Sequence, residues 1–167
     1  MRVYLPLTLA GLAELHRSGE AGPAPLVAYA VTPALREWYL SGDQEELEYA
    51  AMSRAAQASL RLLAVDPEAV RRRVVVAADV PDRAAVADPD RAMDPEALAE
   101  VRLTEAVPVA KLASVHVDAP DAESDIAAAA AALGAADLGD DDAQFVVDGA
   151  ADHELLWYGV QEIDHLL

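Results

Sequence analysis

Cysteine and asparagine are absent from this chain of 167 residues, and lysine occurs only once, as Lys111. The lack of cysteine excludes disulfides, thiolate metal sites and a cysteine nucleophile. No apolar run approaches the roughly 20 residues that a membrane-spanning helix needs, so no membrane association is expected. The first residues also lack the pattern of a secretory signal. We therefore expect a cytoplasmic protein.

Basic residues are missing from a whole third of the chain. The last 56 residues, 112–167, hold none of the 12 basic residues and 13 of the 30 acidic ones. The acidic residues of this region are Asp118, Asp121, Glu123, Asp125, Asp137, Asp140, Asp141, Asp142, Asp148, Asp152, Glu154, Glu162 and Asp164. Such a region repels phosphate and attracts cations or basic partners, so nucleic-acid binding is not expected.

Several sequence motifs of catalysis are also missing. The chain has no phosphate-binding G-x-x-x-x-G-K loop, no dinucleotide-binding G-x-G-x-x-G and no G-x-S-x-G nucleophile turn. His153 and Glu154 begin like a zinc-protease helix, but Trp157 stands where the second histidine is required. These absences leave the question of enzymatic activity open but favour a non-enzymatic protein without a cofactor.

The residues that are present indicate a GC-rich genome. The chain has 38 alanines and uses arginine 11 times against a single lysine. A high-GC bacterium and a halophilic archaeon would both fit. We favour the bacterium because residues 1–111 are only mildly acidic, whereas salt-adapted surfaces carry acid throughout.

The length and the hydrophobic fraction of 54% suit one domain spanning residues 1–167. Alternation and short apolar runs predict strands at Arg2–Leu7, Leu26–Val31, Arg71–Val80, Glu100–Glu105, Leu112–Asp118 and, as a short edge strand, Gln144–Val147. Spacings of three and four predict helices from Thr8 to Arg17, Ala34–Leu40, Asp43 to Val65, Asp121–Leu133 and Ala151–Leu167. Between them, residues 81–95 read as a long acidic, proline-rich loop.

This order of elements predicts an α+β fold. Strands and helices alternate early, and a hairpin is expected to join Glu100–Glu105 to Leu112–Asp118. We expect a mixed or antiparallel sheet with helices mainly on one face, for which a ferredoxin-like arrangement is one option.

Four side chains are candidates for a metal or catalytic site. Asp79 ends the most apolar strand, where ligand-binding groups often lie. His116 and Asp118 share one face of a strand with Ser114, and a solvated polar face is the simpler interpretation of that pattern. His153 completes the set, since histidine and aspartate together suit a metal.

A second set of residues is a candidate partner-binding surface. Trp157 and Tyr158 form an aromatic pair, which packs in the core or lines a binding surface. Asp140, Asp141 and Asp142 form the densest acidic run. The only basic cluster, Arg71–Arg73, is expected to form salt bridges with Glu68 or with the acidic last third.

Four segments carry a family resemblance: MRVYLPLTLAGL, AYAVTPALREWYLSGDQEELEYAAMSRAA, RRRVVVAADVP and LLWYGVQEIDHL. Together they resemble a family of small uncharacterised actinobacterial proteins of unknown function, over nearly the whole chain. The resemblance implies a cytoplasmic location and brings no catalytic or binding residues.

Three hypotheses follow, in order of preference. The first is a binding or regulatory module that presents an acidic C-terminal face to a basic protein partner. The second is a metal-binding protein or metal-dependent enzyme that uses Asp79, His116, Asp118 and His153. The third is a nucleic-acid mimic, ranked last because the acidic residues cluster instead of recurring at a regular spacing.

Overall fold

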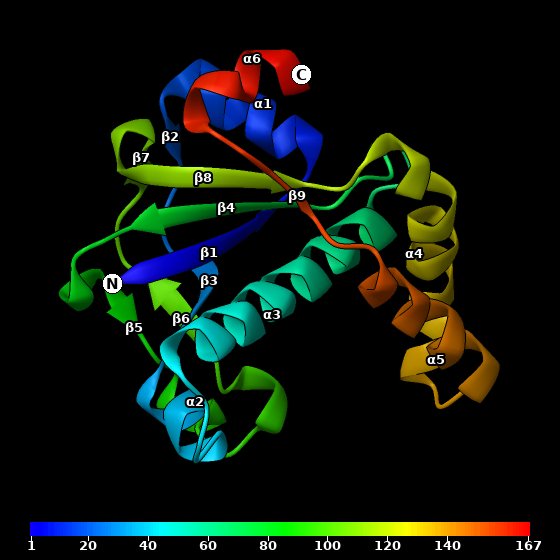
Figure 1. Cartoon of the computed structure of the whole chain (residues 1–167), viewed down its shortest axis with the longest axis horizontal. Coiled ribbons are helices and arrows are strands. Elements are labelled where there is room, and N and C mark those ends of the chain that lie inside the picture. The colour runs from blue at the N-terminus through cyan, green and yellow to red at the C-terminus, as the bar shows by residue number, and fades with distance from the viewer.

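A computed structural model describes residues 1–167 and contains six helices around a seven-stranded sheet (Figure 1). The strands of this sheet are β1 (Arg2–Leu7), β3 (Leu26–Ala30), β4 (Val74–Asp79), β5 (Ala85–Val86), β6 (Glu100–Leu103), β8 (Leu112–Val117) and β9 (Leu156–Tyr158). The helices are α1 (Leu9–Ser18), α2 (Pro33–Trp38), α3 (Gln44–Val65), α4 (Glu123–Asp137), α5 (Asp141–Asp148) and α6 (Ile163–Leu166). Two further strands, β2 (Glu20–Ala21) and β7 (Val107–Pro108), pair with each other in a separate small sheet. The predicted α+β class and single domain are confirmed.

Every strand pair in the sheet is antiparallel, in the order β5-β6-β3-β1-β4-β8-β9. Strands β3 and β4 run in the same direction on either side of β1 and are connected by α2 and α3, which is the split β-α-β unit on which ferredoxin-like sheets are built. The predicted hairpin between the sixth and eighth strands is wrong. Three strands separate β6 from β8 in the sheet, because the chain between them leaves it to form β7.

Alternate residues of the central strands enter two different cores. On one face, Val3 and Val76 pack with Leu12 of α1 and Ile163 of α6. On the other, Tyr4, Val75 and Ala77 pack with helices α2 and α3 through Leu35, Leu47 and Ala51. Strand β4 is therefore covered on both faces, as its unbroken apolar run predicts. The expectation that helices lie mainly on one face is wrong, since α1 and α6 cover the side opposite α2 and α3.

The beginnings of three helices follow the capping rules. The side chain of Asp43 accepts a hydrogen bond from the backbone N–H of Glu46, which starts α3 at the predicted position. Thr8 and Thr32 cap α1 and α2 in the same manner. Helix α3 is also tied to the sheet by Ser59, whose buried hydroxyl donates to the Leu7 carbonyl and accepts from the Val74 N–H.

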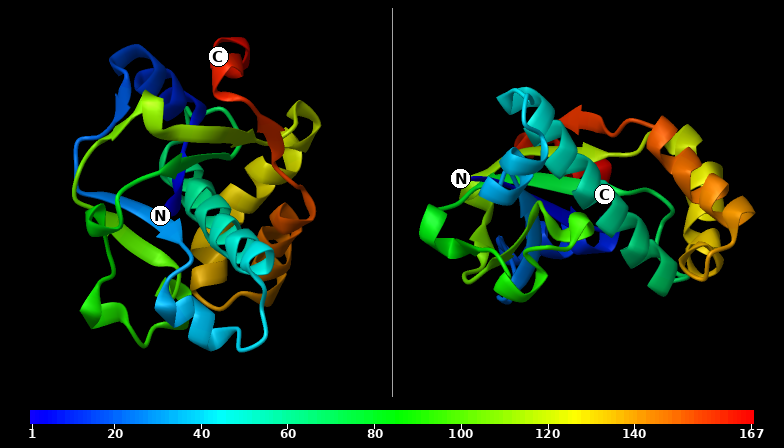
Figure 2. Two further views of the ribbon diagram at one scale, coloured as in Figure 1. Left: turned by 60° about the vertical axis from the view of Figure 1, so that its left-hand side comes forward. Right: turned by 90° about the horizontal axis from the view of Figure 1, so that it is seen from below.

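Helices α4 and α5 lie side by side beyond one end of the strands, as Figure 1 and the right view of Figure 2 show. Alanines on α4 allow it to approach the end of α3, and Ile126 and Leu133 pack there with Leu60 and Leu63. We call α4, α5 and the turn between them the acidic lobe.

The C-terminal region differs most from the sequence-based prediction. The segment 144–147 lies inside helix α5, because Asp140 caps that helix by accepting from the Ala143 N–H. The predicted last helix, 151–167, is instead a short 3₁₀ turn, strand β9 and the brief helix α6. Strand β9 forms because Leu156–Tyr158 pairs with the free edge of β8.

The segment 81–95, expected to be a loop, is built of short regular pieces. It contains 3₁₀ turns at Asp82–Ala84 and Pro89–Arg91 and the edge strand β5. Asp88 and Asp94 each accept a backbone N–H two residues ahead, so the aspartates there cap turns.

Candidate functional site

The four candidate metal ligands are engaged in four separate interactions. Asp79 pairs with Arg2 at 2.8 Å, and Asp118 pairs with Arg73 at 2.8 Å. His116 hydrogen-bonds to Ser114 at 2.9 Å, and His153 lies 2.8 Å from Asp125. No group of three histidine or acidic side chains in the structure is placed to hold a metal ion. The geometry therefore gives the metal hypothesis no support.

The face of β8 that carries Ser114, His116 and Asp118 is covered, and the interpretation as a solvated face is wrong. Ser114 and Asp118 are buried, and His116 is half-buried beside β4. Burial lowers the pKa of His116 below its usual value, and the positive charge of Arg2 acts in the same direction. His116 is thus held neutral as a partner for the Ser114 hydroxyl.

Arg73 and Asp118 form a buried ion pair that joins three segments of the chain. The guanidinium binds both carboxylate oxygens, at 2.9 Å from Nε and 2.8 Å from Nη2, and the backbone N–H of Arg73 donates to the same carboxylate. Nη2 also donates to the carbonyl of His153 at 2.9 Å. This confirms a salt bridge between the basic cluster and the acidic last third. It fixes β4 to β8 and to the approach of β9.

The acidic lobe carries carboxylates without cationic partners. Asp140, Asp141, Asp142 and Asp148 are all exposed, and none of them forms an ion pair. Asp141 and Asp142 occupy the first turn of α5, where the helix dipole favours negative charge. The lobe therefore presents an uncompensated negative surface to solvent.

Apolar side chains are exposed within this negative surface. No residue of α5 is buried, and Phe145 leaves 80% of its surface in solvent. Leu138, in the turn before α5, is 91% exposed. An exposed ring and an exposed leucine among carboxylates resemble the apolar centre and charged rim of a protein interface.

The aromatic pair of the candidate partner surface is divided between the two faces of the sheet. Trp157 stands opposite His116 and is 64% exposed, whereas Tyr158 stands opposite Val115 and packs against the first core. Both belong to β9, and the aspartates Asp140–Asp142 lie at the far tip of the lobe in Figures 1 and 2. The five candidate residues therefore do not form one surface.

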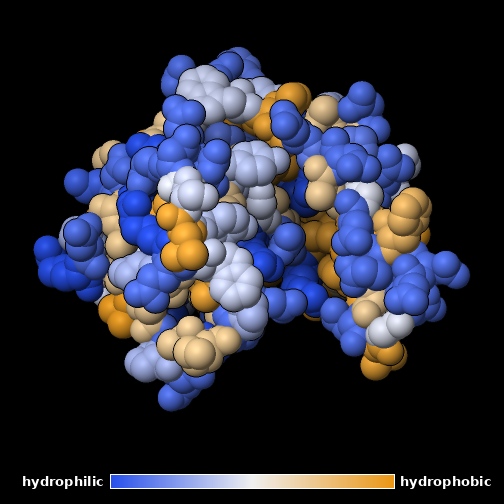
Figure 3. All heavy atoms as spheres, turned by 60° about the horizontal axis from the view of Figure 1, so that its bottom comes forward, coloured by the Kyte–Doolittle hydropathy of each residue, from blue (hydrophilic) through white to orange (hydrophobic).

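A cleft of about 680 Å³ runs along α3, between the acidic lobe and the edge of the sheet. Figure 3 shows it as a hollow with strongly hydrophilic residues at its mouth and apolar residues behind them. Tyr29 of β3 and Met52 of α3 belong to its lining, as do Leu133 and Val147 of the lobe. We call it the α3 cleft.

Four arginines line the α3 cleft, although the chain is strongly acidic. Arg73 is held by Asp118, Arg61 binds both carboxylate oxygens of Asp137, and Arg91 binds Glu100 and Asp94. Arg54 has no carboxylate partner and donates only to the side-chain oxygen of Gln57, at 3.2 Å.

Sequence motifs do not identify these arginines as a site, although the spacing of two of them is a signal. Arg54 and Arg61 are seven residues apart in a helix that capping and periodicity predict well, so they lie on one side of α3. The sequence does not reveal that β3 and the turns of residues 89–97 form the opposite wall of the cleft.

A family of unknown function (DUF6912) matches residues 1–167. The chain belongs to that family. No curated protein and no solved structure matches this chain. None of the helices of the chain is long and apolar enough to cross a membrane.

Proposed function

We propose that the protein is a non-enzymatic binding module that docks a basic protein partner on its acidic lobe. The observation that carries the proposal is Phe145, an exposed ring on a helix with no buried residue, surrounded by unpaired carboxylates. An aromatic anchor provides binding energy when it is covered, and the surrounding charges select a partner of opposite sign.

The charges of the lobe support a basic partner over an acidic one. No lysine or arginine follows Lys111, so nothing within the lobe neutralises Asp141, Asp142 or Asp148. A positively charged partner would be attracted over about 10 Å at 0.1 M salt, and this attraction would speed its encounter.

The exposed ends of the lobe suit contact with another molecule. Helix α4 packs on α3 and on the residues that follow α5, whereas α5 has no buried residue. A partner can therefore reach α5 and the turn before it without displacing any part of the core.

The test is affinity capture with three forms of the full chain. The first is the wild type, and the second carries Asp141→Asn, Asp142→Asn and Asp148→Asn, which leaves the cap Asp140 intact. The third is a matched control with Glu37→Gln, Glu68→Gln and Glu105→Gln, exposed acids of the body that form no ion pair. We expect a basic protein to be retained by the wild type and the control and lost from the lobe variant.

Salt and a fourth form of the chain sharpen the result. Retention should weaken as salt is raised toward about 1 M, where the screening length falls to roughly 3 Å. Phe145→Ser should reduce retention at both salt concentrations, because it removes the apolar anchor and leaves the charge unchanged. A partner that is retained equally by all four forms, or unaffected by salt, would rule out the lobe as the docking surface.

A further inference from the structure

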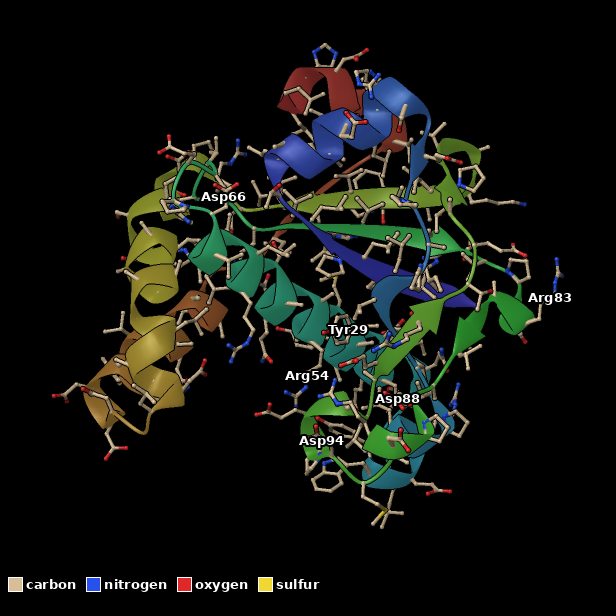
Figure 4. All side chains as sticks on the ribbon, turned by 180° about the vertical axis from the view of Figure 1, so that it is seen from behind. Tyr29, Arg54, Asp66, Arg83, Asp88 and Asp94 are labelled. Atoms are coloured by element: carbon tan, nitrogen blue, oxygen red, sulfur yellow. The ribbon has the colours of Figure 1, made fainter.

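The α3 cleft contains one guanidinium, that of Arg54, which forms no salt bridge with an acidic side chain. Arg54 projects from α3 into the space in front of the turns at residues 89–97, where Figure 4 labels it between Tyr29 and Asp94. Its only hydrogen bond goes to the neutral side chain of Gln57. The other three arginines of the cleft all have carboxylate partners, so Arg54 is the one with binding capacity to spare.

A phenol, Tyr29, lines the same cleft as these arginines. Tyr29 is half-buried in the cleft wall, and burial, followed by the charge of Glu100, raises the pKa of its hydroxyl. Arg91, Arg54 and Arg61 are near enough to act on the same pKa in the opposite direction. The hydroxyl is a hydrogen-bond donor at neutral pH, and it makes no hydrogen bond within the chain.

Arg61 can be recruited to the same point at little cost. Its pair with Asp137 is roughly half exposed on both sides. Exposed pairs of this kind are held weakly because water screens them and two long side chains must be ordered. A guanidinium fork can exchange such a carboxylate for another anion, since it binds phosphate and carboxylate in the same bidentate geometry.

We propose that the α3 cleft binds a small organic molecule through a phosphate or carboxylate group, which Arg54 and Arg61 hold as donors together with the Tyr29 hydroxyl. The volume of about 680 Å³ lies within the range of small-molecule sites. Met52, Leu133 and Val147 offer apolar surface for the rest of the molecule. This inference goes beyond the proposed partner binding, because it concerns a small molecule held by arginines of α3, although Asp148 borders both surfaces.

The acidic residues of the cleft do not argue for a cation in this position. Asp137 and Glu100, the two carboxylates that contact its arginines from the lining, are already paired. Glu96, Asp148 and Glu154 also border the cleft. None of these three acts on the pKa of Tyr29, which responds to Glu100 and to the arginines Arg91, Arg54 and Arg61.

The experiment uses four probes that share one aromatic ring: phenyl phosphate, benzoate, benzyl alcohol and benzylamine. Each is titrated into the full chain while the side-chain N–H signals of its arginines are followed by NMR. We expect the two anions to shift the Arg54 and Arg61 signals to saturation, and the alcohol and the amine to leave them unchanged. The tighter of the two anions tells whether the natural ligand carries phosphate or carboxylate.

Matched variants decide whether the site is specific. Arg54→Gln should weaken the binding of the anions by about tenfold, the effect of one charge-assisted hydrogen bond. Arg17→Gln removes the same charge from α1, on the other face of the sheet, and should leave the affinity unchanged. Arg61→Gln serves as a second cleft variant if Arg54→Gln does not fold.

Four results would overturn the proposal. One is an equal response to benzyl alcohol and to the anions, which would mean that only the ring is recognised. Another is a preference for benzylamine. The others are an equal loss of affinity in the Arg54 and Arg17 variants and no saturable shift at all. None of these results bears on Phe145, Asp141 or Asp142, which do not line the cleft, so the partner-binding proposal stands or falls separately.

Discussion

The body of the protein and its acidic lobe use carboxylates in different ways. In the body, Asp79, Glu100 and Asp118 each bind an arginine from a distant or neighbouring strand or turn. In the lobe, only the acids that face the body are paired, Asp125 with His153 and Asp137 with Arg61. Those at the outer end have no partner. The paired carboxylates of the body therefore contribute to folding, whereas those at the tip of the lobe contribute only to the field that other molecules meet.

Breaking the buried pair of the body should have the largest effect. Asp118→Asn leaves the Arg73 guanidinium, 5% exposed, without a counter-charge. We expect the free energy of unfolding to fall by about 3–5 kcal/mol, because a buried charge is left unpaired. Urea denaturation measures this change.

The control for that variant is Asp79→Asn in the neighbouring strand. Its pair with Arg2 has the same bidentate form but is exposed, so the expected loss is about 1 kcal/mol or less. Equal losses in the two variants would show that burial does not distinguish these pairs.

Removing the hydroxyl of Ser59 should have the next largest effect on stability. Ser59→Ala leaves the Leu7 carbonyl and the Val74 N–H without their buried partner. The expected loss is about 1–3 kcal/mol in the free energy of unfolding. Ser53→Ala, on the same helix and without a hydrogen bond through its side chain, should be neutral or slightly stabilising. A neutral Ser59→Ala would mean that water replaces the hydroxyl.

The pH dependence of stability should reveal His116. Its pKa is lowered in the folded protein by burial and by Arg2. As the pH falls below about 6.5, the unfolded chain therefore binds a proton at His116 that the folded chain binds only at lower pH. The free energy of unfolding should therefore fall as pH drops through that value. In His116→Gln this contribution is gone, while the other three histidines are present in both proteins and cancel.

The measurement is urea denaturation of the wild type and His116→Gln at several pH values between about 7.5 and 5. The stability of the wild type relative to the variant should decrease across this interval. A constant difference would place His116 in an environment where its proton affinity is unchanged by folding.

Neutralising the tip of the lobe should have the smallest effect on stability. Asp141→Asn with Asp142→Asn removes charge that favours the start of α5, but it also removes repulsion between neighbouring acids. The change in the free energy of unfolding is expected to stay within about 1 kcal/mol. Thermal or urea denaturation checks this, and a large loss would mean that these acids serve the fold and not a partner.

Local rules predicted the first two-thirds of the chain well. Asp43 and Glu46 set the start of α3, Thr8 set the start of α1, and the apolar run of β4 predicted its central place. Each of these signals acts between residues that are close in sequence or through an unbroken pattern. The pairing of strands depends on distant residues, which is why the hairpin between β6 and β8 was predicted wrongly.

The C-terminal region shows where local patterns compete. The segment 144–147 has residues that favour strands, yet the cap at Asp140 and the acids that follow it begin a helix. Leu156–Tyr158 has helical spacing with the residues after it, yet the free edge of β8 makes it a strand. For Ser114, His116 and Asp118, alternation indicated an exposed face, because the sequence could not show that β8 lies between β4 and β9 or that Asp118 pairs with Arg73.

The α3 cleft was beyond reach from the sequence for a related reason. Its arginines come from α3, from the start of β4 and from the turn before β6, and their convergence depends on the order of strands in the sheet. The spacing of Arg54 and Arg61 indicated a shared helix side. It could not indicate Tyr29 opposite them.

The chain between β8 and β9 leaves the sheet and returns to it at adjacent positions, since Val117 and Leu156 are direct partners across the two strands. Whatever lies between these residues is closed off like the loop of a hairpin, and the register of the sheet does not depend on its length. Within that segment, the buried Asp118 and the residues of α4 that pack on α3 are tied to the body, whereas no residue from Leu138 to Asp148 is buried. Insertions and deletions among members of the family are therefore expected to concentrate between Leu138 and Asp148, while the sheet and α4 would be inherited as a fixed frame.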